Sequence, residues 1–97
     1  MLRPERTQGH EQAGQRYGVI VQSHNLRLST VVIVPTSTSA RRQPFRPEIE
    51  VAGQETRALV EQIKTVDAGR LGDLVGHLTP EEMEDMDYCL QLVLGLY

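Results

Sequence analysis

A short run of β-branched residues, Ser29–Val34, sets the strongest constraint on the fold of this 97-residue chain. An apolar run this short and this rich in valine and isoleucine predicts a β-strand rather than a helix. Pro35 follows and has no N–H to give to a sheet, so we expect the strand to end, bulge or lie at an edge there. The run is also far shorter than the ~18 apolar residues of a membrane span, so no membrane contact is expected.

Other segments predict further strands with loops between them. Tyr17–Gln22 is β-branched, and Glu48–Val51 alternates polar and apolar residues as a half-buried strand does. Ala58–Val66 fits both helical and strand spacing on its residues alone. Residues 1–16 are polar and interrupted by glycine, which predicts a long loop. Turns or breaks are expected at Ser23–Asn25, Gly53–Glu55, Gly69, Gly72 and Gly76.

The end of the chain carries a complete helix signal. Thr79 is a preferred N-cap, Pro80 suits the first helical position, and Glu82 completes a capping box three residues after the cap. Apolar residues at helical spacing predict the face that packs on the sheet: Met83, Met86, Leu90, Val93 and Leu94. Strands followed by one such helix predict a mainly β fold with a single C-terminal helix, in one domain over residues 1–97.

Charge is divided unevenly along the chain. The formal net charge is −3, yet residues 1–46 carry seven arginines against two glutamates. Residues 47–97 carry three cations against eleven carboxylates. Nine of the ten cations are arginine, whose planar fork matches phosphate. The first half could therefore bind a polyanion, although the arginines could equally do no more than keep a small protein soluble.

Residue types and spacing exclude several kinds of site. Cys89 is the only cysteine, so an internal disulfide and a cysteine-based zinc site are excluded. A single cysteine fits a reducing compartment, and we expect a cytoplasmic protein with Cys89 in or near the core. The three histidines are scattered, and no glycine-rich phosphate loop stands between a strand and a helix. No metal or other cofactor is expected, and the N-terminus lacks the apolar stretch of a secretory signal.

Two polar segments next to predicted strands carry the side chains best suited to binding or catalysis. Gly9–Arg16 brings together an imidazole, a carboxylate, amides and a guanidinium, and Thr36–Arg42 brings four hydroxyls and two guanidiniums. Hydroxyls and guanidinium groups that converge can cradle a phosphate, and an arginine can stabilise charge that develops in phosphoryl transfer. From residue types alone, both segments could also be plain polar loops.

The order of these motifs resembles that of the MazF/PemK-like toxins. Gly9–Arg16 and the strand after it are similar to the family's G-x-E-Q-x-G-x-R-P loop and V-x-V-x strand. Val32–Thr38 resembles its V-V-P-x-T-S strand end, and Val60–Asp67 resembles E-Q-I-R-T-I-D. Thr79–Leu96 is similar to its closing helix, so the resemblance covers nearly the whole chain from Gly9 onward.

The resemblance implies a small SH3-like barrel of the MazF/PemK/CcdB type, and it assigns Ala58–Val66 to a strand. It implies the toxin of a type II toxin–antitoxin system, a metal-independent endoribonuclease that cuts single-stranded RNA by attack of the substrate's 2′-OH. The implied partners are a second copy of the chain and a MazE-like antitoxin. Two alternatives stay open: a non-catalytic toxin that binds DNA gyrase, and an inactive truncated member that only binds antitoxin.

The resemblance also assigns residues to the site. The family's catalytic arginine falls on Arg16 and its hydroxyl residue on Ser37. Arg16 would neutralise the transition state, Ser37 would hold a phosphate oxygen, and Glu11 is our candidate for accepting the 2′-OH proton. The further candidates for contacting RNA are His10, Gln12, Thr38, Arg41, Glu61 and Gln62.

Three departures from the family pattern matter. Tyr17 replaces the proline that usually follows the arginine, and Ser37 replaces threonine, losing a methyl group that restricts its rotamer. The family's opening strand, R-G-D-x-x-x-V-D, is missing, and only Leu2-Arg3-Pro4 resembles its tail. We therefore expect a barrel without its first strand, with unpaired N–H and C=O groups at the edge.

Overall fold

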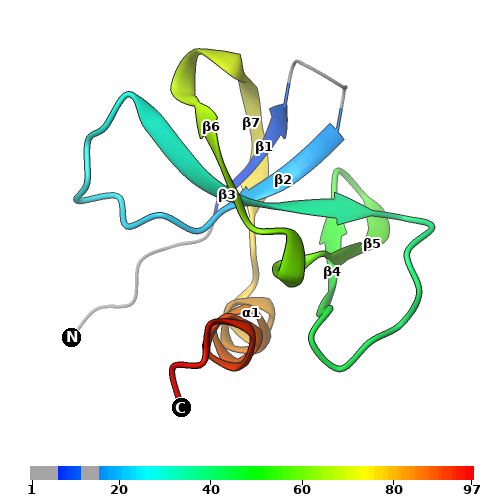
Figure 1. Cartoon of the computed structure of the whole chain (residues 1–97). Helices are drawn as coiled ribbons and strands as arrows, with labels where there is room; N and C mark the ends of the chain where they lie inside the picture. Colours follow the sequence, from blue (N-terminus) through cyan, green and yellow to red (C-terminus); the bar gives the residue numbers. More distant parts are fainter. Residues whose placement is uncertain (1–6, 12–15) are drawn as a thin grey trace.

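The computed structural model describes residues 7–11, as backbone, and residues 16–97 (Figure 1). The described residues form a curled, half-barrel antiparallel sheet with one helix packed against it, which confirms the mainly β fold with a C-terminal helix. The elements are β1 (Thr7–Glu11), β2 (Arg16–Ile20), β3 (Thr30–Ser37), β4 (Glu48–Val51), β5 (Gln54–Ala58), η1 (Val60–Gln62), β6 (Lys64–Asp67), η2 (Ala68–Arg70), β7 (Leu71–His77) and α1 (Pro80–Leu94).

Strand β3 is the centre of the sheet. The strand order is β4-β5-β3-β2-β1-β7, and β6 also pairs with β3. One edge of β3 pairs with β2, while the other edge pairs with β6 over residues 30–33 and with β5 over residues 36–37. The valine-rich run is therefore a strand, as predicted, and it organises both halves of the sheet.

Pro35 lies inside β3 and neither ends the strand nor sits at its edge, contrary to the prediction. Within a strand, the N–H and C=O of one residue point to the same neighbour. The Pro35 carbonyl accepts a hydrogen bond from Leu59 N at 2.8 Å, at the point where β3 changes partner from β6 to β5. The missing N–H of Pro35 therefore faces a break in the ladder, where no strand requires it.

The prediction of one strand over Ala58–Val66 is wrong in its middle. β5 ends at Ala58, η1 follows, and β6 begins at Lys64, all along the same edge of β3. The 3₁₀ turn η1 lies where Pro35 interrupts the ladder, and it places Val60 fully in the core. The interruption in the segment thus follows from the proline on the neighbouring strand.

The prediction of a long loop over residues 1–16 is wrong for Thr7–Glu11. These residues form β1, which pairs with β2 over five positions and with β7 on its other side. Pairing on both edges overrides the polar, glycine-containing composition. The sheet therefore continues past β2 through β1 to β7.

Glycine marks some of the other predicted breaks and not others: Gly69 lies in η2, between β6 and β7, as expected. The stretch expected to be broken around Gly72 and Gly76 is the seven-residue strand β7. The β4–β5 turn lies at Ala52 and Gly53, one residue earlier than predicted, because Gln54 and Glu55 already belong to β5. Both turn residues have positive φ, 52° and 79°, as a two-residue type I′ hairpin requires.

Helix α1 starts with the predicted capping box. Thr79 Oγ1 accepts a hydrogen bond from Glu82 N at 3.1 Å, and Glu82 Oε1 accepts one from Thr79 N at 2.9 Å. The predicted apolar face packs on the core at Met86 and Leu90, joined by the buried Cys89. The prediction for Leu94 is wrong, since 48% of this residue is exposed; it follows Val93 by about 100° around the helix.

The core lies between α1 and the sheet. Its buried members come from both: Val19, Val34, Ile49, Val51, Ala58, Val60, Leu78, Met86, Cys89 and Leu90. Met83 and Val93 add partly buried contacts from the helix. This arrangement leaves the ends of β1, β2 and β3 near residues 11, 16 and 37 away from the helix contact.

Within the part of the chain that the structure describes, no helix has both the length and the apolar character needed to cross a membrane.

Candidate functional site

The strand register brings the three predicted catalytic positions into one row. Glu11 on β1 is paired with Arg16 on β2. The β2–β3 pairs run from Ile20↔Ile33 to Gly18↔Pro35 and stop there; the same register continued by two residues would set Arg16 opposite Ser37. Opposed positions on antiparallel strands have Cβ atoms about 4.5–5.5 Å apart. Glu11 and Arg16 are therefore neighbours on paired strands, and Ser37 is at the end of the next strand; we call this set the Arg16 row.

Two contacts between β2 and β3 fix the strands next to the Arg16 row. Thr36 Oγ1 donates a hydrogen bond to the Tyr17 carbonyl at 3.0 Å, which ties β3 to β2 one position from the row. Gly18 allows close approach there, because a Cβ on it would lie 3.3 Å from Val34 O. Arg16 itself is exposed, and Ser37 is half-buried with its Oγ 3.3 Å from Ser39 Oγ. The hydrogen bond between Thr36 and Tyr17 thus keeps the start of β2, with Arg16, close to the end of β3, with Ser37.

The other predicted RNA contacts are spread around this row. His10 lies one position along β1, paired with Tyr17. Gln12 lies outside the described residues. Thr38 and Arg41 are exposed in the loop that follows β3. Gln62 is exposed in η1, along the β3 edge.

The structure places Glu61 in an ion pair with Arg46, and its contact with RNA stays a prediction. Arg46 Nη2 lies 2.6 Å from Glu61 Oε2, and Arg46 Nε donates to the same oxygen at 3.1 Å. The hydrogen bond from Arg46 holds the pKa of the Glu61 carboxyl below its usual value, and Glu61 raises the pKa of Arg46 in return. Arg46 Nη1 also donates to Arg41 O at 3.1 Å. This pair fastens the β3–β4 loop to η1.

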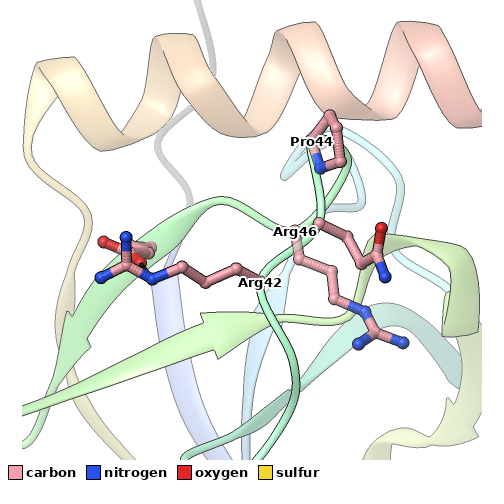
Figure 2. A pocket seen from close by; sticks show the side chains of 5 residues that line it. Arg42, Pro44 and Arg46 are labelled. Atoms are coloured by element: carbon pink, nitrogen blue, oxygen red, sulfur yellow. Dashed lines mark ion pairs between the residues drawn. The ribbon is translucent and has the colours of Figure 1, made fainter.

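Helix α1 supports the same loop from the other side. Cys89 Sγ lies 3.5 Å from the Pro44 carbonyl oxygen. Figure 2 shows Pro44 where the loop comes close to the helix. Burial raises the pKa of the Cys89 thiol, and the nearby Asp85 charge adds to the effect. Cys89 is therefore a core residue that contacts the loop, as its place beside the apolar helix face indicated.

A basic pocket next to the row escaped the sequence analysis. Arg57 on β5 is paired with Ser37, so the Arg16 row continues onto a fourth strand. The pocket beside it is open, with a volume of about 370 Å³. It is lined by Arg42, Gln43, Pro44, Arg46 and Glu48 (Figure 2). The signal that could have found Arg57 is the alternation of β5, which was hidden because Gly53–Glu55 had been assigned to a turn.

The chemistry available in this region is that of phosphate binding. The Arg16 row offers a guanidinium beside a hydroxyl, with a carboxylate-bearing residue at the next position. Within the described residues, no group of three histidine, cysteine or acidic side chains is placed to hold a metal ion. Arginine and hydroxyl groups are suited to a phosphodiester, because they can bind its oxygens and stabilise added negative charge.

Comparison with known protein families shows which family the chain belongs to. A family model described as PemK-like, MazF-like toxin of type II toxin–antitoxin systems matches residues 1–94. The chain belongs to this family. It is therefore a MazF/PemK-like toxin of the type II toxin–antitoxin class, and the resemblance of its motifs is confirmed.

Two curated relatives agree with this assignment. A Mycobacterium tuberculosis protein described as a candidate toxin is 44% identical over 89 residues, covering 91% of this chain and 84% of the relative. The endoribonuclease EndoA of Bacillus subtilis is 28% identical over 96 residues, covering 91% of this chain and 83% of the relative.

Solved structures share the fold of this MazF/PemK-like chain. A mycobacterial endoribonuclease in complex with its cognate antitoxin has a TM-score of 0.80 at 25% identity, covering all of this chain and 97% of the other. MazF in a MazE–MazF complex from Deinococcus radiodurans has a TM-score of 0.81 at 13% identity, with full coverage of both chains. The second likeness shows the fold alone.

Proposed function

We propose that this toxin is an endoribonuclease that cleaves single-stranded RNA without a metal ion. The observation that carries the proposal is the Arg16 row: Arg16 is paired with Glu11, and the residue after Arg16, Tyr17, is hydrogen-bonded through its carbonyl to Thr36, the residue before Ser37. Support comes from relatives named as endoribonucleases, one by sequence and one by structure. The row contains the groups needed for phosphoryl transfer by the substrate's own 2′-OH.

In this mechanism the 2′-oxygen forms a bond to phosphorus, and the bond from phosphorus to the 5′-oxygen breaks. Glu11 accepts the proton of the 2′-OH, and Arg16 stabilises the charge on the phosphorane-like transition state. Ser37 donates a hydrogen bond to a phosphate oxygen. The leaving 5′-oxygen takes a proton from Arg16 or from water, and the products carry a cyclic phosphate and a 5′-OH. Charge stabilisation by preorganised donors supplies the largest share of the acceleration.

The test is cleavage of single-stranded RNA by the purified protein in EDTA, followed by chemical analysis of the new ends. We expect cuts at a short recurring motif and 5′-OH ends that a polynucleotide kinase can label directly. Intact RNA across several unrelated sequences would overturn the proposal, and so would cleavage that requires a divalent ion. Inhibition of DNA gyrase without RNA cleavage would favour the non-catalytic alternative.

We further propose that the toxin acts as a homodimer and that an acidic antitoxin tail inhibits it. A structural neighbour is an endoribonuclease bound to its cognate antitoxin, which supports the second partner. Tyr88 and Leu92 are exposed one turn apart on α1, and Leu96 is exposed just beyond the end of the helix, which supports a protein contact. Light scattering at micromolar concentration should give twice the chain mass, and an acidic product of a neighbouring gene should abolish cleavage. A monomer that no such product inhibits would contradict both.

A further inference from the structure

The Arg16 row does not end at Ser37. Arg57 on β5 is paired directly with Ser37 on β3, so a second arginine flanks the hydroxyl from the side opposite Arg16. β5 and β2 are the neighbours of β3 on its two edges, and neighbouring strands lie about 4.8 Å apart. Two guanidinium groups that flank one hydroxyl are placed to contact successive phosphates of one strand, with Ser37 between them.

The guanidinium of Arg57 is held by hydrogen bonds from two of its nitrogens, Nη1 and Nη2, whereas its Nε has no partner among the described residues. Its Nη1 donates to the Ala40 carbonyl at 2.8 Å, and only 20% of its side chain is exposed. Its Nε is buried and has no hydrogen-bond partner within the described part of the chain. Buried polar groups are nearly always paired, so a buried, unpaired donor on a rigid arginine needs an explanation. A ligand from solvent can contact only the exposed fifth of the Arg57 side chain, so the case for a subsite depends on the charge around it.

The charge around Arg57 is incompletely neutralised. Glu48 Oε1 lies 3.3 Å from Arg57 Nη2 and also 3.3 Å from Arg42 Nε, so two cations share one carboxylate. The side chains of Glu48 and Arg42 are 54% and 82% exposed, and ion pairs this exposed are weak. In contrast, the charge of Arg46, which lines the pocket together with Arg42, is neutralised by its ion pair with Glu61. Figure 2 shows Arg42 and Arg46 leaving the loop in opposite directions. The surplus positive charge therefore belongs to Arg42 and Arg57.

We propose that Arg57, assisted by Arg42, forms a subsite for the RNA phosphate next to the one that is cleaved. The proposal rests on the proposed ribonuclease function and adds a specific binding contact to it. A phosphate oxygen takes up the surplus charge of Arg42 and Arg57, and Glu48 competes with it for the same two arginines. Arg57 is thus an RNA-binding residue, while Arg16 and Ser37 act on the bond that breaks.

The first experiment measures the salt dependence of RNA binding. The probe is a single-stranded RNA oligonucleotide spanning a mapped cleavage site, with 2′-deoxyribose at the cleaved position so that it stays intact. For single strands, the slope of log K against log salt changes by about 0.7 for each phosphate contact. Arg57→Gln should reduce the slope by about that amount. Arg27→Gln is the matched control, because its loop joins the opposite ends of β2 and β3 (Figure 1).

The second experiment removes the phosphate charge instead of the arginine. Replacing one phosphate at a time by a neutral methylphosphonate should weaken binding to the wild type at the position next to the cleaved bond. Arg57→Gln should be insensitive to the same replacement, because the contact is already lost. If the two losses simply add, Arg57 does not contact that phosphate and the proposal is wrong.

A third variant separates substrate binding from loop support, since Arg57 also holds Ala40. Glu48→Gln removes the competing carboxylate, so it should tighten binding of the same RNA and steepen the salt slope. If the Glu48 pairs serve only to hold the loop, binding weakens or stays unchanged, which overturns the proposal. Failure of the wild type to bind or cut any RNA would refute the ribonuclease function itself. Normal cleavage with identical behaviour of Arg57→Gln and Arg27→Gln would refute the subsite alone.

Discussion

Glu82 joins the helix to the sheet through two hydrogen bonds, and its removal gives a quantitative test of the fold. One carboxylate oxygen accepts from Thr79 N at 2.9 Å inside the capping box. The other accepts from Glu50 N on the edge strand β4 at 2.8 Å. Loss of a cap costs about 1 kcal/mol of unfolding free energy. We assign about 1 kcal/mol to the second bond, because it is exposed to solvent.

Glu82→Ala should therefore lower the free energy of unfolding by about 2 kcal/mol, which corresponds to roughly 8–16 °C in Tm for a domain of this size. Glu82→Gln keeps one carbonyl oxygen and should lose about half as much. Glu81→Ala is the matched control, since Glu81 is exposed on the same helical turn and should cost less than about 0.5 kcal/mol. Urea denaturation followed by circular dichroism measures all three. Equal stability of Glu82→Ala and Glu81→Ala would refute the reasoning.

Three further predictions address the loop, the hydroxyl and the thiol. The pKa of Glu61 is lowered in the folded state, so its contribution to the free energy of unfolding is complete above its ordinary pKa of 4.5 and is lost as the pH falls below 4.5. Glu61→Gln should therefore reduce the fall in the free energy of unfolding at acid pH, measured by denaturation at several pH values. Ser37→Ala should lower the single-turnover rate of RNA cleavage, whereas Ser37→Thr should keep it, and equal rates for Ala and wild type would exclude a role for the hydroxyl. Cys89 should react with a thiol reagent far more slowly in the native protein at pH 8 than in urea, because burial raises its pKa and blocks access; similar rates would place it at the surface.

The elements that could be predicted from the sequence are those with local signals. The capping box of Thr79 and Glu82 needs only four consecutive residues, and the β-branched run Ser29–Val34 identifies itself by composition. β1 could not be predicted in this way, because its polar residues become a strand only through pairing with β2 and β7. The 3₁₀ turn η1 likewise depends on a proline that lies on a different strand.

The candidate site also contains residues that the sequence predicts and residues that only the structure reveals. Arg16 and Ser37 could be found because each belongs to a recognisable motif, although only the register of β2 and β3 brings them together. Arg57 has no motif, and its importance comes from its pairing with Ser37. The role of Glu61 could not be read either, since its partner Arg46 is 15 residues away in a loop. Contacts between distant segments are therefore what the sequence alone left undetermined.

The most direct test of the central claim is the single-turnover rate of RNA cleavage by Arg16→Ala, measured in EDTA beside Arg27→Ala. Arg16 occupies the middle of the row that we assign to the reaction, while Arg27 is an exposed arginine at the far ends of the same strands. The account predicts a rate roughly 10²–10³-fold below wild type for Arg16→Ala, with an unchanged unfolding curve, and a nearly normal rate for Arg27→Ala. Equal rates for the two variants would contradict it.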